Sequence, residues 1–163
     1  MDKDRGIGVG FYFLGGLLMK TEFVREVSLR YKGRKEKWFS AIRSPENAAC
    51  FVRSILPDNV KEHFVALFLN AQHEVVAYSI VATGMASSCP VHPREVYQPA
   101  IIAGACAILV AHSNPSGTCE PSADDKAITK RLKEAGELLG IPLLDHVIVT
   151  DYCFYSFNDQ AAL

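Results

Sequence analysis

The stretch CAILVAHSNPSGTCEPSADD, residues 106–125, is the part of this chain that decides its fold. It begins as a short, unbroken apolar run that ends at His112, which predicts a buried strand. A proline-containing loop follows, and Ser122 then caps a long amphipathic helix. Because α/β proteins build their sites where strands end and in the loops that follow, we expect functional residues between His112 and Asp125.

The sequence on either side predicts a single α/β domain with a mixed sheet flanked by helices. Ser44-Pro45-Glu46 is typical of a helix start, because it offers an N-cap, a proline at the first position and an acidic first turn. The expected order is strand, helix, hairpin, helix, strand, helix, strand, strand. The ranges are 23–31, 44–56, 62–70 with 74–82, 93–105, 106–111, 122–140, 143–150 and 153–157. We assign residues 1–43 to a leader and first strand, and residues 44–163 to the domain.

Composition places the chain among ordinary soluble domains. It has 163 residues, of which 49% are apolar and 21% charged, and its formal charge is −1. These values exclude intrinsic disorder and a histone-like basic protein, and they argue against a dedicated DNA-binding protein.

The five cysteines stand at positions 50, 89, 106, 119 and 153. An odd number without a C-x-x-C pair does not suit a disulfide framework. We therefore interpret them as free thiols in a reducing compartment and expect a cytoplasmic protein. Cys50 and Cys106 lie in apolar stretches, so we expect them in the core.

Two segments near the amino terminus leave alternatives open. Residues 6–19 form an apolar run with five glycines, too short for a membrane helix of about 20 residues. They suit a glycine-rich strand or a leader, an interfacial segment, or an export signal. Residues 30–37, from Arg30 to Lys37, hold five cations next to aromatic side chains. They suit either weak contact with nucleic acid or a solvated turn.

His112 and Asp125 are residue types that bind zinc. A catalytic zinc ion has three protein ligands and one water, and a nearby glutamate can act as base on that water.

The chain resembles the RadC branch of the JAB/MPN metalloprotease family over about residues 44–157. The family signature is H-x-H-P, followed after a short loop by S-x-x-D, with a glutamate some fifty residues upstream. The matching motifs include His92-Pro93-Arg94-Glu95-Val96, Pro115-Ser116-Gly117, Thr129-Lys130-Arg131-Leu132, Asp145-His146 and Tyr155-Ser156-Phe157. The resemblance implies a cytidine-deaminase-like fold and zinc-dependent hydrolysis of a peptide or isopeptide substrate. It is closest to the short forms that lack a helix-hairpin-helix region, some of which sit on mobile elements.

The resemblance also implies a role for each site residue. Glu62 would be the general base, His112 and Asp125 would bind Zn²⁺, and Ser122 would stabilise an oxyanion. The second zinc histidine of the family falls on Asn114. Since an amide oxygen is a poor substitute for imidazole on zinc, the expected metal site is impaired.

Three interpretations of the function are open. The first is a hydrolase with a weakened zinc site, in which the Cys119 thiolate could replace the missing imidazole. The second is a metal-free, non-catalytic binding module associated with DNA repair or mobile elements. The third is a nucleic-acid-associated protein that works through residues 30–37. No membrane contact is expected in any of them.

Structural roles remain open for the same residues. Ser122 and Asp125 also fit a capping box, and His112 could be a hydrogen-bonded structural histidine. We expect Asp145-His146 to be a structural pair or to support the site indirectly.

Overall fold

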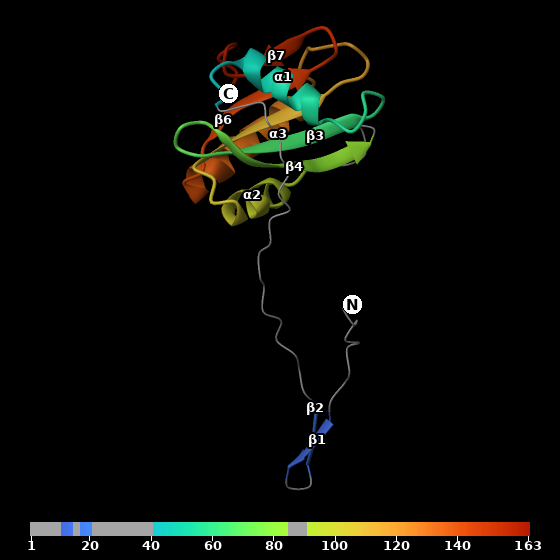
Figure 1. Cartoon of the computed structure of the whole chain (residues 1–163), viewed down its shortest axis with the longest axis vertical. Helices are drawn as coiled ribbons and strands as arrows, with labels where there is room; N and C mark the ends of the chain where they lie inside the picture. Colours follow the sequence, from blue (N-terminus) through green and yellow to red (C-terminus); the bar gives the residue numbers. More distant parts are fainter. Residues whose placement is uncertain (1–10, 15–16, 21–40, 85–90) are drawn as a thin grey trace, which may run out of the picture. The chain divides into compact units, whose positions relative to one another are not determined.

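The structure is a computed structural model that describes residues 11–14, 17–20, 41–84 and 91–163 (Figure 1). These residues belong to two units, Met1–Gly33 and Arg34–Leu163. In the first unit, β1 (Phe11–Leu14) and β2 (Leu17–Lys20) form an antiparallel hairpin with Leu14 opposite Leu17. The strand interpretation of the glycine-rich run is therefore correct for its described part. The expected strand 23–31, the cationic residues 30–37 and Cys89 lie outside the described residues.

The second unit is an α/β domain built on a five-stranded sheet in the order β4-β3-β5-β6-β7. Only β5 and β6 are parallel, so the sheet is mixed, as predicted. The helices are α1 (Pro45–Ile55), α2 (Pro93–Ile102) and α3 (Ala123–Leu139). The strands are β3 (Glu62–Leu69), β4 (Val75–Gly84), β5 (Ala107–Ser113), β6 (Leu143–Val149) and β7 (Phe154–Ser156). Within the described ranges, no helix has both the length and the apolar character needed to span a membrane.

Local capping explains where α1 and α3 begin and where α3 ends. The Ser44 side chain accepts a hydrogen bond from the amide of Asn47 at the start of α1. Ser122 does the same for Asp125 at the start of α3. Gly140 ends α3 in a left-handed conformation with φ of 68°, which glycine adopts without steric cost. These ends lie within a few residues of the predicted ones because capping depends on neighbouring residues alone.

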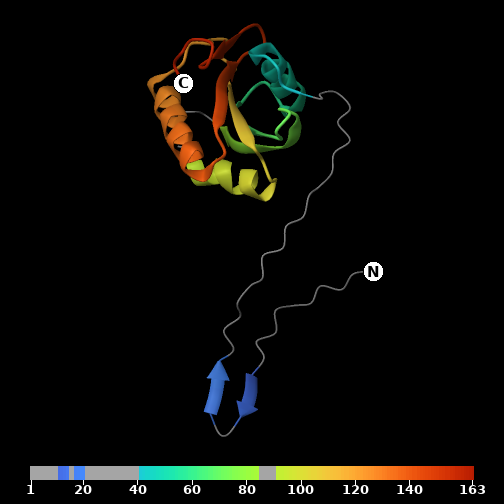
Figure 2. The same cartoon turned by 90° about the vertical axis from the view of Figure 1, so that its left-hand side faces the viewer.

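Figure 2 shows the sheet edge-on, with α1 on one side and α2 and α3 on the other. The sheet separates two apolar layers. β3 serves both layers, because alternate side chains of a strand point to opposite faces. Val65, Leu67 and Leu69 pack with α1, whereas the alternate residues Phe64 and Phe68 pack with α2 and α3. Burial on both faces explains the nearly continuous apolar sequence of β3.

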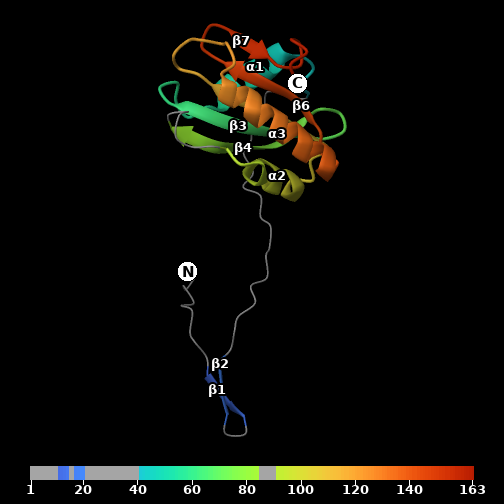
Figure 3. The ribbon, with the colours of Figure 1, turned by 180° about the vertical axis from the view of Figure 1, so that it is seen from behind.

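A close contact between α2 and α3 helps to set the position of α3 (Figure 3). The Tyr97 hydroxyl donates a hydrogen bond of 2.8 Å to the carbonyl of Leu132 on α3. A Cβ atom at Gly136 would overlap both that hydroxyl and the Ile141 carbonyl. Gly136 therefore allows the approach that holds α3 beside the sheet, where its first turn meets the end of β5.

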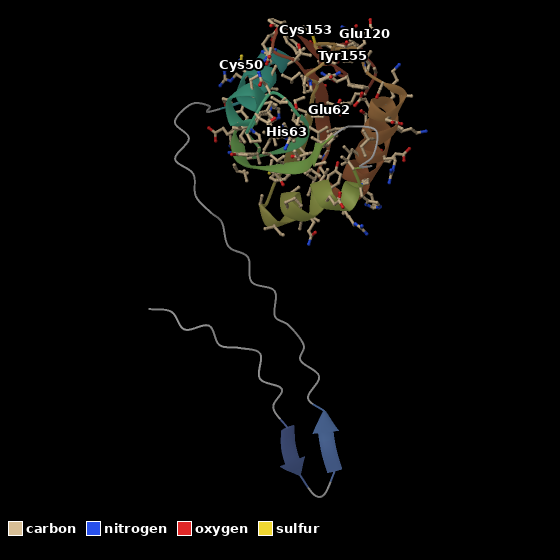
Figure 4. All side chains as sticks on the ribbon, turned by 90° about the vertical axis from the view of Figure 1, so that its right-hand side faces the viewer. Cys50, Glu62, His63, Glu120, Cys153 and Tyr155 are labelled. Carbon is tan, nitrogen blue, oxygen red and sulfur yellow. A yellow bond between two sulfur atoms is a disulfide. The ribbon has the colours of Figure 1, made fainter. Side chains whose placement is uncertain are left out.

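The cysteine prediction is wrong in two respects. Cys119 and Cys153 form a disulfide in this structure, with an S–S distance of 2.05 Å. Cys50 and Cys106 are free but exposed, not core residues. Cys50 lies on the outer side of α1 (Figure 4), and Cys106 comes directly before β5. Apolar neighbours in sequence did not indicate burial, because a single helical position can face solvent between two buried ones.

Candidate functional site

A cavity of about 550 Å³ lies between the first turns of α3 and the ends of β3, β4 and β5. Its polar lining comes from Glu62, Thr83, His112, Ser122, Asp124, Asp125 and Arg131. Its other lining residues are mainly apolar: Phe64, Ala82, Gly84, Val91, Ala127 and Ile128. This volume lies within the usual range of ligand pockets, about 300–1,000 Å³.

Strand register brings Glu62 close to His112. β3 runs antiparallel to β5 with Phe64 opposite His112, and Glu62 shares the face of Phe64 because it lies two residues away. The His112 Nε2 atom is 3.9 Å from Glu62 Oε2. Its Nδ1 atom is 2.9 Å from Asp125 Oδ1. His112 is thus placed between two carboxylates, one from β3 and one from α3.

The Asp125 carboxylate is held by three hydrogen bonds, one from His112 and two from Ser122. Its Oδ2 atom accepts hydrogen bonds from the Ser122 amide at 2.9 Å and from the Ser122 hydroxyl at 2.6 Å. Burial by itself raises the pKa of Asp125, but the hydrogen bonds from His112 and Ser122 outweigh it and hold that pKa well below its usual range. Asp125 therefore stays ionised at neutral pH although its residue is only 7% exposed.

Ser122 acts as a cap in this arrangement. Its hydroxyl donates to Asp125 Oδ2 and accepts from the Asp125 amide, so both partners lie in the first turn of α3. Ser122 lines the cavity, and its hydroxyl donates its proton to the Asp125 carboxylate. The structural interpretation of Ser122 and Asp125 as a capping box is confirmed.

Asn114 is not among the cavity-lining residues. Its Nδ2 atom donates to the Thr118 carbonyl at 3.0 Å, and its Oδ1 atom accepts from the Ser116 amide at 3.1 Å. The amide therefore closes the loop that follows β5. The structure brings Glu62, His112, Ser122 and Asp125 together and leaves Asn114 apart from them.

The disulfide holds the same loop at its other end. It joins Cys119 to Cys153, between β6 and β7, over a separation of 34 residues. In Figure 4, Cys153 lies beside Glu120, the residue that follows Cys119. A sulfur atom in a disulfide is not a thiolate ligand, so Cys119 does not replace the missing imidazole in this structure.

These residues do not fit a zinc centre with three protein ligands. Within the described part of the chain, no three His, Cys, Asp or Glu side chains are grouped so that they could hold a metal ion. Both Asp125 oxygens already face protein donors, and Asn114 is engaged in its loop.

A second histidine, His146, contacts the site indirectly through Thr129. The sequence left open whether it is structural or supports the site. His146 on β6 is fully buried, and its Nδ1 atom lies 2.6 Å from the Thr129 hydroxyl. That hydroxyl donates to the Asp125 carbonyl, so His146 Nδ1–H is the donor to Thr129. Burial lowers the pKa of His146 to about 3, which keeps the ring neutral. The pairing of Thr129 with His146 had no signal in the sequence, since 17 residues separate them.

Comparisons with known proteins agree with this architecture. The α/β domain, with its Glu62–His112–Asp125 cluster at the start of α3, is that of a JAB-type protein. The family profile described as the RadC-like JAB domain matches residues 42–162. The chain belongs to this family.

The three relatives described here are each named as a UPF0758 protein. One from Shouchella clausii is 42% identical over 119 residues, which cover 73% of this chain and 52% of the relative. One from Geobacillus is 38% identical over 154 residues, covering 94% of this chain and 66% of the relative. One from Rubrobacter xylanophilus is 41% identical over 148 residues, covering 90% and 63%. The chain thus spans about half to two-thirds of the length of these relatives.

Proposed function

We propose that this RadC-like JAB domain binds a peptide or isopeptide-type ligand in the cavity beside His112, and that it does so without a resident zinc ion. The observation that supports this proposal is the closed hydrogen-bond set around Asp125. His112 and Ser122 satisfy the carboxylate that would otherwise bind the metal. Protein donors thus satisfy this carboxylate without a metal ion.

The cavity chemistry supports a peptide ligand. Carboxylates and an imidazole line one end, where an amide group has hydrogen-bond partners, and Phe64 and Ile128 offer apolar surface for a side chain. An apolar wall with a few convergent polar groups is the usual composition of a ligand site.

Equilibrium dialysis against a random library of acetylated tetrapeptides, in the presence of EDTA, tests this proposal. We expect the protein to retain a subset of peptides, read out by mass spectrometry. Ala127→Trp fills the cavity from an exposed position of α3 and should abolish retention, whereas Lys126→Trp, outside the cavity lining, should not. Retention that requires added zinc, or no retention at all, would refute the proposal.

A second candidate is hydrolysis of the bound amide, the activity that the family resemblance implies. The observation that favours it is the geometry of His112. Its Nδ1 atom is 2.9 Å from Asp125 Oδ1, and its Nε2 atom faces Glu62 Oε2 across 3.9 Å. A histidine whose tautomer is set by a carboxylate is a common general base.

Metal analysis and peptide cleavage separate the two candidates. We expect native protein purified without chelator to hold well under one equivalent of zinc and to leave the peptide library uncleaved. Asn114→His replaces the amide that closes the loop with the imidazole of the family signature, which is released from the hydrogen bonds to Thr118 and Ser116 and can turn toward His112. The zinc content and cleavage should then rise, and Asp125→Ala in that background should remove both. A full equivalent of zinc together with cleavage in the native protein would instead establish the hydrolase and exclude the metal-free module.

A further inference from the structure

Along α3, the residues that line the cavity change from acidic to apolar and then to basic. Asp124, Ile128 and Arg131 line it at spacings of four and three residues, so they share one side of the helix. The carboxylates of Asp124 and Asp125 lie in the first turn, the apolar residues follow, and Arg131 is at the far end. At about 1.5 Å per residue, Arg131 lies about 9 Å along the helix axis from Asp125.

Among the described residues that line the cavity, Arg131 is the one lysine or arginine. It is exposed, and no ion pair or hydrogen bond joins its guanidinium to another residue in the described ranges. Its neighbour Lys130 is also exposed but is 4.0 Å from Glu134 and does not line the cavity. Two adjacent cations of α3 thus differ in their access to the site.

Charge then sets the direction in which a peptide can bind. Glu62, Asp124 and Asp125 line the end near His112 and repel a carboxylate there, whereas Arg131 attracts one at the other end. An extended chain advances about 3.3 Å per residue, so about 9 Å corresponds to about three residues.

We propose that Arg131 determines specificity by binding the terminal carboxylate of an extended peptide, about three residues beyond the amide that faces His112. This inference rests on the peptide-binding function proposed above. Ala127, Ile128 and Val91 would contact the side chains between the two ends. The ligand class is therefore a short peptide or protein tail with a free carboxyl terminus.

The test compares two forms of the acetylated tetrapeptide library, one with free carboxylates and one with terminal amides. We expect the native protein to retain the acids about tenfold better than the amides, the effect of one charge-assisted bidentate pair. Arg131→Gln should abolish this preference, and Arg131→Lys should keep part of it. The matched control Lys130→Gln should keep all of it, since Lys130 lies outside the cavity lining.

Each other outcome overturns a defined part of the proposal. Equal retention of acids and amides by the native protein, with retention still lost in Ala127→Trp, would overturn the role of Arg131 and leave peptide binding intact. A preference for acids over amides that persists in Arg131→Gln would also overturn the role of Arg131 and leave peptide binding intact. Retention of neither library would overturn both the role of Arg131 and the proposed function.

Discussion

The connection between β5 and α3 has two regions, a cavity end and a loop end, which are stabilised in different ways. At the cavity end, His112, Ser122 and Asp125 form a hydrogen-bonded set around one carboxylate. At the loop end, the Asn114 amide closes a turn, and the disulfide of Cys119 ties the loop to the segment between β6 and β7. The comparison teaches that asparagine at position 114 belongs to the loop, and that the cavity wall does not depend on it.

The disulfide should have the largest effect on stability. Reduction with dithiothreitol, or Cys153→Ser, should lower the free energy of unfolding by about 3–4 kcal/mol, because it releases a closed loop of 34-residue separation in the unfolded chain. Urea denaturation measures this change, and peptide retention at the cavity end should persist under native conditions.

Cys50→Ser and Cys106→Ser are matched controls, since both thiols are free and exposed. Neither should alter the free energy of unfolding or its response to dithiothreitol. If the native protein were equally stable with and without the reductant, Cys119 and Cys153 would not be joined in solution.

Asp125→Ala should have the next largest effect, at the cavity end. It removes the acceptor of His112 Nδ1–H and of both Ser122 donors, and we expect a loss of about 2–3 kcal/mol in the free energy of unfolding. Asp124→Ala, on the exposed neighbouring position, is the control and should change stability little. A loss in Asp125→Ala no greater than in Asp124→Ala would show that the carboxylate does not organise this end.

A smaller, pH-dependent effect should come from His146 beneath Asp125. Burial lowers the pKa of His146 to about 3, whereas an unfolded histidine has a pKa of about 6.5. Below about pH 6.5 the unfolded chain therefore takes up a proton that the folded chain does not, and stability should fall by about 1.4 kcal/mol per pH unit. Urea denaturation between pH 7 and 5 measures this slope, above the range where carboxylates titrate.

His146→Gln should flatten that slope whatever its effect on absolute stability. The exposed His73→Asn should not change it. A slope that is unchanged in His146→Gln would mean that another group takes up the proton. Because the pKa of Asp125 is held low, this residue contributes stability that is fully present above about pH 4 and is lost only in stronger acid. Its titration therefore does not affect the slope measured between pH 7 and 5.

Much of the fold could be predicted because its signals are local. The predicted helix over 44–56 is observed as Pro45–Ile55, and the predicted hairpin over 62–70 and 74–82 as β3 and β4. Caps, turn residues and apolar runs act over a few residues, so the sequence displays them directly. Prediction failed for Cys50, where the helical position faces solvent although its neighbours are buried.

The candidate site was predictable in part. The family motifs placed Glu62, His112, Ser122 and Asp125 in one site, and the structure gathers them around one cavity. Motifs identify the residues of a site, but they do not indicate which hydrogen-bond partner each polar atom has. The turn closed by Asn114 and the chain from His146 through Thr129 to Asp125 depend on the exact spacing of β5, β6 and α3.

The sequence by itself therefore determined the order of elements from residue 44 onward, the family, and four of the residues that line the cavity, because these follow from local periodicity and recognisable motifs. Only the tertiary structure decided that Cys119 meets Cys153, that Asn114 turns away from His112, and that Arg131 shares a cavity with Asp125. The physical reason is that each of these results depends on how separate elements pack. Packing sets distances between residues that no local pattern relates.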